Sequence, residues 1–141
     1  MKKVILYVED EPSDALFMRR AWQKLGSPCV LQEARDGQEA IEYLEGSGPF
    51  SDRAANPPPD YVLLDLKMPR KTGHEVLEWL RSHPQHKGMP VIVYTSSREG
   101  QDLARTRALG IDDYIVKPVS FAALVDVART IAARWGIPLS P

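Results

Sequence analysis

"YVLLDLKMP" (residues 61–69) places an acidic residue, Asp65, at the end of an apolar run and just before a proline. A continuous apolar run with branched side chains is typical of a strand that is covered on both faces. A charge that is buried without partners is energetically costly. We therefore expect Asp65 either to stand at the end of this strand or to be supported by other charges.

Short apolar runs alternate with helical patterns on both sides of this segment. The strand-like runs are "KVILYV", "CVLQEA", "YVLLDL", "PVIVYT" and "DDYIVKP". Helical spacing of apolar residues follows each run, over residues 13–25, 36–46, 72–84, 98–109 and 120–135. This alternation predicts an α/β fold with five parallel strands joined by right-handed crossovers and helices on both faces of the sheet.

The helices carry further expectations. Phe17 and Phe121 fall on the apolar stripes of the first and last helices, whereas Val127 lies off the stripe. The helix over 98–109 has few apolar anchors, so we expect it to be weakly held; these anchors are Leu103, Ala104 and Ala108. Capping pairs in the D/S/T-x-x-E pattern predict three helix starts: Asp36 with Glu39, Thr72 with Glu75, and Ser96 with Glu99.

Length and composition favour a single domain over residues 1–141, with 43% hydrophobic residues. Residues 46–60, rich in Gly, Pro and Ser, are expected to form a loop embellishment. The net charge of -1 gives no basic surplus for nucleic acid or an anionic membrane, and no apolar run could span a bilayer. One cysteine, Cys29, excludes an internal disulfide and suits the cytoplasm.

Chemically complementary side chains follow four of the predicted strands. These are Glu9 and Asp10, then Asp65, Thr95 and Lys117. Taken singly, the acidic residues suit loops or helix caps, Thr95 a turn and Lys117 the surface. Together at one edge of a parallel sheet, the three carboxylates would repel unless a cation joined them, and oxygen ligands favour Mg²⁺. A carboxylate, a divalent ion, a lysine and a hydroxyl suit phosphoryl transfer, which makes Asp65 a candidate nucleophile.

Four segments resemble the signature sequences of response-regulator receiver domains of two-component signalling. They are "ILYVEDEPSD", "VLLDLKMPRKTGHEVL", "VIVYTSS" and "GIDDYIVKPV". The resemblance covers nearly the whole chain and implies a flavodoxin-like (βα)5 fold with strand order 2-1-3-4-5. It also implies site roles by position. Asp65 would be the phosphoacceptor, and Asp10, Asp65 and the main-chain carbonyl of Lys67 would bind Mg²⁺, with Glu9 acting through water. Lys117 would bind the phosphoryl group, and Thr95 and Tyr114 would form the switch pair. The Lys67 side chain would line the route of water to the phosphoryl group, and the small Ser96 leaves the site open.

The resemblance implies a signalling module and not an enzyme acting on other substrates. A sensor histidine kinase would donate the phosphoryl group, and the loop before the third strand is similar to that of stand-alone regulators paired with bacterial phytochromes. The output would be a downstream target, a relay protein or a homodimer formed through residues 98–135. Two alternatives are less favoured: an aspartyl phosphatase of the haloacid-dehalogenase-like type would need Asp at position 67, where this chain has Lys, and a flavin carrier would have its cofactor phosphate repelled by acidic strand ends.

Overall fold

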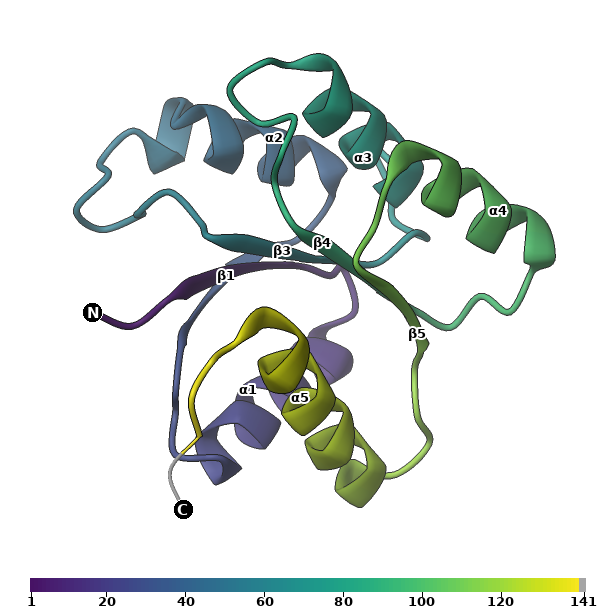
Figure 1. Cartoon of the computed structure of the whole chain (residues 1–141). Helices are drawn as coiled ribbons and strands as arrows, with labels where there is room; N and C mark the ends of the chain where they lie inside the picture. The colour runs from purple at the N-terminus through teal and green to yellow at the C-terminus, as the bar shows by residue number, and fades with distance from the viewer. Residues whose placement is uncertain (140–141) are drawn as a thin grey trace.

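A five-stranded parallel sheet forms the centre of the computed structural model, which describes residues 1–139 (Figure 1). The strand order is β2-β1-β3-β4-β5, as expected. The change of direction between β1 and β3 creates the switch point at which α/β sheets bind ligands. The strands are β1 (Val4–Val8), β2 (Val30–Ala34), β3 (Tyr61–Leu64), β4 (Val91–Thr95) and β5 (Asp113–Val116).

Helices cover both faces of this sheet, and Figure 1 shows α1 and α5 on one face with α2, α3 and α4 on the other. Two apolar cores result, one under each layer, which explains why β1 and β4 are buried along their whole length. None of the helices in residues 1–139 has the length and apolar character needed to cross a membrane. The helices are α1 (Pro12–Lys24), α2 (Gly37–Glu45), α3 (Gly73–Ser82), α4 (Gly100–Leu109) and α5 (Phe121–Trp135).

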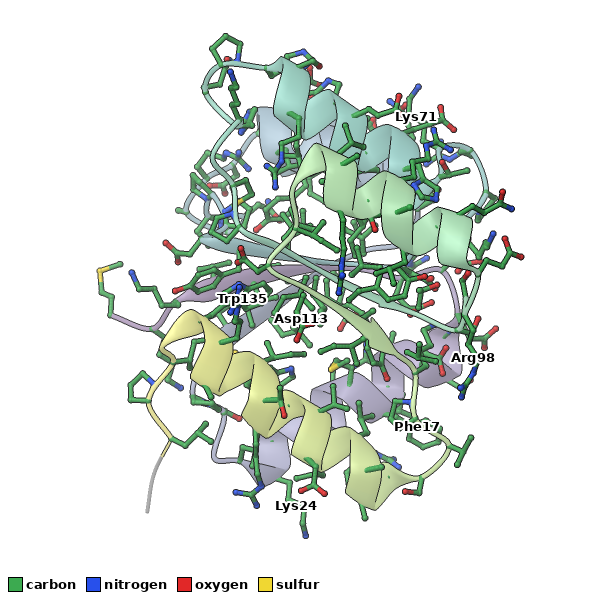
Figure 2. The ribbon with its side chains drawn as sticks, turned by 45° about the vertical axis from the view of Figure 1, so that its right-hand side comes forward. Phe17, Lys24, Lys71, Arg98, Asp113 and Trp135 are labelled. Carbon is green, nitrogen blue, oxygen red and sulfur yellow. The ribbon has the colours of Figure 1, made fainter. Side chains whose placement is uncertain are left out.

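The strand register aligns the carboxyl ends of the central strands. Val8 is paired with Leu64, so that the residues following β1 and β3 emerge side by side. Figure 2 shows Phe17 and Arg98 toward this end of the molecule and Trp135 at the opposite end. The polar residues after the strands therefore gather at one edge of the sheet.

Residues 46–60 connect α2 to β3 and contain a 3-10 helix, η1 (Gly48–Phe50). The Arg53 guanidinium donates to the Leu44 carbonyl at 3.2 Å and lies 5.5 Å from the ring centre of Tyr43. The Tyr43 hydroxyl in turn donates to the Pro57 carbonyl at 2.8 Å. These bonds fasten the segment to α2.

Two predicted helix faces differ from the structure. Phe17 and Phe121 were expected on core stripes but are 44% and 39% exposed. Phe121 is the first residue of α5, whereas Phe17 is exposed between Ala15 and Met18, which belong to the buried face of α1. Val127, expected to project away from the core, is half-buried and packs against the core formed by the sheet with α1 and α5.

The attachment of α4 also differs from the prediction. Ala104 and Ala108 are exposed and Leu103 is only half-buried, so the expected apolar anchors are largely absent. The buried residues of α4 are instead Asp102 and Thr106. The helix is held by polar contacts.

Of the three predicted capping pairs, Thr72 with Glu75 forms the complete capping box. The Asp36 side chain accepts a bond from the Glu39 amide at 2.8 Å. The prediction for Ser96 is wrong: α4 begins after Glu99, with no side-chain cap, and Ser96 is exposed. The hydroxyl used in this loop belongs to the next residue, described below.

Candidate functional site

Three carboxylates meet at the carboxyl ends of β1 and β3. One oxygen from each of Glu9, Asp10 and Asp65 lies within 4.8 Å of the others, and no other such group of possible metal ligands occurs in residues 1–139. Glu9 and Asp65 are buried, at 5% and 4% exposure, while Asp10 is exposed to solvent. Oxygen donors without His or Cys fit a hard divalent cation, and the exposed Asp10 leaves room for water ligands.

Lys117 brings a positive charge into this cluster from the end of β5. Its ammonium nitrogen lies 2.8 Å from Glu9 Oε1, 3.0 Å from Asp65 Oδ2 and 2.8 Å from Asp14 Oδ2. Its backbone amide donates to the Thr95 carbonyl at 2.8 Å, which fixes the position of the strand end. One ammonium group thus faces four carboxylates when Asp10 is included, and the excess of negative charge favours a bound cation.

Asp14 was not predicted from the sequence. It lies in the first turn of α1, which begins directly after the acidic strand end. The available signal was an acidic residue in the first turn of the helix that directly follows the acidic strand end.

Burial dominates the electrostatics of Glu9. It raises the pKa of this carboxyl to about 7, and Asp65 adds to the rise while Lys117 partly offsets it. The Tyr7 hydroxyl donates to Glu9 Oε1 at 3.0 Å, and the Glu11 amide donates to Oε2 at 3.3 Å. Burial acts in the opposite direction on Lys117, but its carboxylate partners outweigh it and raise the pKa of the ammonium above its ordinary value. Lys117 is therefore charged at neutral pH.

The backbone around Asp65 is fixed by the start of α3. The Lys67 amide donates to Asp65 Oδ1 at 3.3 Å, and the Gly73 amide donates to the Leu66 carbonyl at 3.1 Å. A Cβ atom on Gly73 would lie 2.2 Å from the Asp65 carbonyl oxygen. Only glycine permits this approach, which holds the Asp65 carboxylate at the mouth of the site.

Thr95 and Tyr114, the predicted switch pair, converge on Ser97. Thr95 is wholly buried, and its hydroxyl oxygen accepts a bond from the Ser97 amide at 3.4 Å. The Tyr114 hydroxyl donates to the Ser97 carbonyl at 3.0 Å. The loop between β4 and α4 therefore contacts both residues.

A second polar cluster, centred on Asp102 of α4, was also missed. Its carboxylate accepts bonds from Ser97 Oγ at 2.5 Å and His74 Nε2 at 2.9 Å, and its Oδ2 lies 3.3 Å from Lys67 Nζ. The hydroxyl and imidazole bonds, with a smaller contribution from Lys67, lower the pKa of Asp102 to about 2. The sequence signal was weak, because a charged helix residue is usually on the surface.

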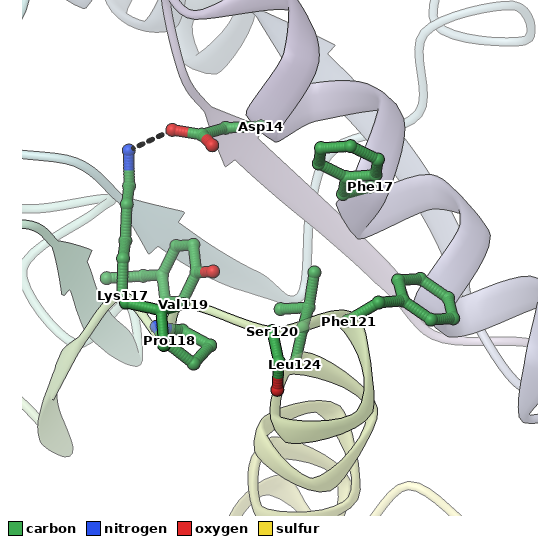
Figure 3. A pocket seen from close by; sticks show the side chains of 9 residues that line it. Asp14, Phe17, Lys117, Pro118, Val119, Ser120, Phe121 and Leu124 are labelled. Atoms are coloured by element: carbon green, nitrogen blue, oxygen red, sulfur yellow. Dashed lines mark hydrogen bonds and ion pairs between the residues drawn. The ribbon is translucent and has the colours of Figure 1, made fainter.

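An apolar surface adjoins Lys117 on the opposite side of the sheet edge from α4 (Figure 3). Phe17, Val119 and Phe121 are 44%, 103% and 39% exposed, and together with Asp14 and Lys117 they line one cavity. Figure 3 shows the Lys117 ammonium directed at Asp14, with the Phe17 ring on α1 and the Phe121 ring at the start of α5. The site thus has an exposed apolar border.

The predicted metal-binding, acceptor and lysine side chains therefore lie together, whereas His83 and His86 do not join them. His83 stacks on Trp79 with ring centres 4.2 Å apart, and the His86 ring lies tilted against Trp79 with ring centres 5.0 Å apart. The thiol of Cys29 is buried, which raises its pKa to about 11. Neither feature supports additional chemistry.

Comparison with known proteins agrees with this geometry. Residues 5–129 match the response regulator receiver domain family. Response regulator Rcp1 of Synechocystis is 31% identical, with 94% of this chain and 88% of the relative covered; the probable methanogenesis regulatory protein FilR2 of Methanothrix harundinacea is 35% identical, with 94% and 83% covered.

Solved structures show the same fold. The phosphorylated cyanobacterial phytochrome response regulator RcpA superposes with a TM-score of 0.87, at 31% identity and 100% coverage of both chains. The Mn²⁺-bound form of Rcp1 superposes with a TM-score of 0.85, at 30% identity and 99% coverage of both chains. The chain therefore belongs to the response regulator receiver domains, the phosphorylation-dependent signalling modules of two-component systems.

Proposed function

We propose that Asp65 accepts a phosphoryl group from a phosphohistidine of a sensor histidine kinase. The observation that carries this proposal is the buried Asp65 carboxylate held 3.0 Å from the Lys117 ammonium inside an acidic cluster. A carboxylate oxygen attacks phosphorus, the P–O bond forms as the P–N bond breaks, and the imidazole leaves with a proton. The reaction modifies this protein alone, so the chain acts as a signalling protein and catalyses only its own phosphorylation and dephosphorylation.

Some residues of the site would bind the metal ion, and others orient the Lys117 ammonium. Glu9 and Asp14 hold the Lys117 ammonium beside Asp65, where it can contact a phosphoryl oxygen. Mg²⁺ would neutralise the phosphoryl oxygens and the attacking carboxylate. Its proposed ligands are Glu9, Asp10, Asp65 and the main-chain carbonyl of Lys67.

The switch follows from the contacts of Ser97. In the aspartyl phosphate, the Thr95 hydroxyl turns to a phosphoryl oxygen and gives up its bond to the Ser97 amide. Tyr114, bonded to the carbonyl of the same residue, moves with the loop. The signal then passes to a downstream target or relay protein, or to a second copy of the chain, through residues 98–135.

The apolar surface of Phe17, Val119 and Phe121 suits the kinase. It borders Asp14 and Lys117, so a helix carrying the phosphohistidine can pack there while its imidazole faces Asp65. RcpA is a phytochrome response regulator, and this similarity is the reason that we propose a bacterial phytochrome in the cytoplasm as the kinase.

Intact-mass measurement after incubation with a small phosphodonor tests the function. Wild type should gain one phosphoryl group when Mg²⁺ is present and none in a chelator, whereas Asp65→Asn should gain none. Asp126→Asn, at an exposed position on α5, is the matched control and should be labelled like wild type. Equal labelling of the Asp65 variant would reject the assignment.

A further inference from the structure

The first turn of α4 is attached to the body of the protein through Asp102. Of the two buried residues of this helix, Thr106 donates its hydroxyl to the Asp102 carbonyl within the helix itself. The Asp102 carboxylate makes its contacts outside the helix. The other end of α4 is held separately, by the Arg81 guanidinium on the carbonyls of Leu109 and Gly110. The amino-terminal end of α4 therefore depends on the partners of one carboxylate.

These partners come from the segments that flank the phosphoacceptor. Lys67 lies two residues after Asp65, and Ser97 lies two residues after Thr95. The third partner, His74, lies in the first turn of α3, which begins against the Asp65 backbone. Asp102 is thus in contact with both loops that border the site.

Lys67 differs from Ser97 and His74 because its side chain can move away from Asp102. Ser97 and His74 are buried, whereas the Lys67 side chain is 56% exposed and its nitrogen lies 3.3 Å from Asp102. An ion pair with an exposed partner contributes about 0–1 kcal/mol. Lys67 and Asp10 also line one open cavity, so the ammonium has a free path toward the site.

We infer that Asp102 is a positioning residue for the hydrolysis of the aspartyl phosphate: by pairing with Lys67 it keeps the ammonium away from the phosphoryl group and leaves the approach of water open. The inference rests on the proposed function of Asp65. A phosphoryl group brings about two negative charges, so it competes with Asp102 for the same ammonium. When Lys67 changes partner, its ammonium neutralises phosphoryl oxygens, occupies the approach of water and slows hydrolysis.

Coupling to α4 follows in both directions. Any partner that draws α4 away from the sheet releases Lys67 and lengthens the lifetime of the phosphoryl group. By linkage, a phosphoryl group that attracts Lys67 weakens the attachment of the first turn of α4 by the same free energy by which detachment of α4 favours pairing of Lys67 with the phosphoryl group.

A double-mutant cycle separates this role from a structural one. Wild type, Asp102→Asn, Lys67→Gln and the double variant are phosphorylated with a small phosphodonor and Mg²⁺, the donor is removed, and the loss of the phosphoryl group is followed by intact mass. Asn keeps the shape of Asp102 and one acceptor oxygen, and its amide nitrogen can donate to whichever of Ser97 and His74 the oxygen does not meet, but the charge that holds Lys67 is lost. We expect Asp102→Asn to slow the loss by roughly three- to tenfold and to have no effect in the Lys67→Gln background.

Arg105→Gln is the matched control, because it breaks the ion pair of α4 with Glu78 on α3 without touching Lys67. It should leave the lifetime unchanged. An unchanged or shorter lifetime in Asp102→Asn, the same change with and without Lys67, or an equal effect of Arg105→Gln would overturn the inference.

Hydrogen exchange of the α4 amides provides a second test that does not need the Asp102 variant to fold. Exchange in the first turn should be faster in Lys67→Gln than in wild type, and phosphorylation should accelerate it less in Lys67→Gln than in wild type. Equal acceleration in the two proteins would overturn the coupling. Absence of labelling in wild type, or labelling of Asp65→Asn, would instead contradict the proposed function before any lifetime is measured.

Discussion

Gly73→Ala tests whether the start of α3 positions Asp65, the proposed phosphoacceptor. A Cβ atom at Gly73 would lie 2.2 Å from the Asp65 carbonyl oxygen and 2.7 Å from the Leu66 Cα atom. Both are backbone atoms, so no side-chain rotation can relieve the contact. Gly100 offers a matched control, because it is also the first residue of a helix and a Cβ atom there meets nothing within 4 Å.

The two substitutions should change the free energy of unfolding in opposite directions. Overpacking costs about 1–3 kcal/mol, and we expect Gly73→Ala to lie at the upper end because backbone must move on both sides. Gly100→Ala removes conformational freedom from the unfolded chain without strain, which stabilises by about 0.4–1 kcal/mol. The expected difference in the free energy of unfolding is therefore roughly 4 kcal/mol.

The site should respond about as strongly as the stability. A displacement of about 1 Å in a reacting group costs about 100-fold in rate, so Gly73→Ala should be phosphorylated far more slowly by a small phosphodonor. Urea unfolding followed by tryptophan fluorescence gives the stability, and intact mass gives the labelling rate. If Gly73→Ala matched Gly100→Ala in stability and wild type in labelling rate, the close approach of α3 to Asp65 would not position the carboxylate.

Three further variants test other parts of the site. Thr95→Ala should accept the phosphoryl group but lose most of the NMR shift changes that phosphorylation causes in wild type; changes as wide as those of wild type would exclude Thr95 as the switch. Burial raises the pKa of Glu9 from 4.5 to about 7, so the neutral form of Glu9 favours the folded state. Its contribution to the free energy of unfolding is complete below about pH 4.5 and is lost as the pH rises through about 7. Glu9→Gln should therefore flatten the fall in melting temperature of metal-free protein between about pH 5 and pH 8, and a slope equal to that of wild type in calorimetry would contradict this account. Phe17→Ser should slow transfer from a phosphorylated histidine kinase by roughly tenfold, because Phe burial contributes about 1.5–3 kcal/mol, and leave labelling by a small phosphodonor unchanged; equal slowing in both assays would remove Phe17 from the kinase surface.

The fold and the carboxylate cluster were predictable because each depends on a repeating rule. Apolar runs that alternate with helical patterns require a parallel sheet, and a parallel sheet collects its strand ends at one edge. Glu9 and Asp65 are neighbours because Val8 pairs with Leu64. Asp14 was not predicted because its role depends on its ion pair with Lys117, whose side chain extends across the carboxyl-end edge of the sheet. No local sequence pattern indicates this contact.

The capping prediction for Ser96 and Glu99 fails at the start of α4 for a local physical reason. Ser96 and Glu99 match the same capping pattern as Thr72 and Glu75, which do form the box. In the loop before α4, however, the neighbouring Ser97 turns its hydroxyl to Asp102 at 2.5 Å and accepts a bond from the Glu99 amide at 3.3 Å. A tertiary partner for one serine therefore removes the cap expected from the other, and spacing alone cannot reveal that partner.

The same partner changes the physical account of how α4 is attached. An apolar anchor stabilises a helix in proportion to its buried area, whatever the state of a distant site. A buried carboxylate stabilises it only while its donors remain, since an unpaired buried charge is costly. The donors of Asp102 include Lys67 and Ser97, which lie in the two loops that a phosphoryl group on Asp65 would rearrange. The attachment of α4 is thus conditional on the site, and a count of apolar residues in the helix cannot measure it.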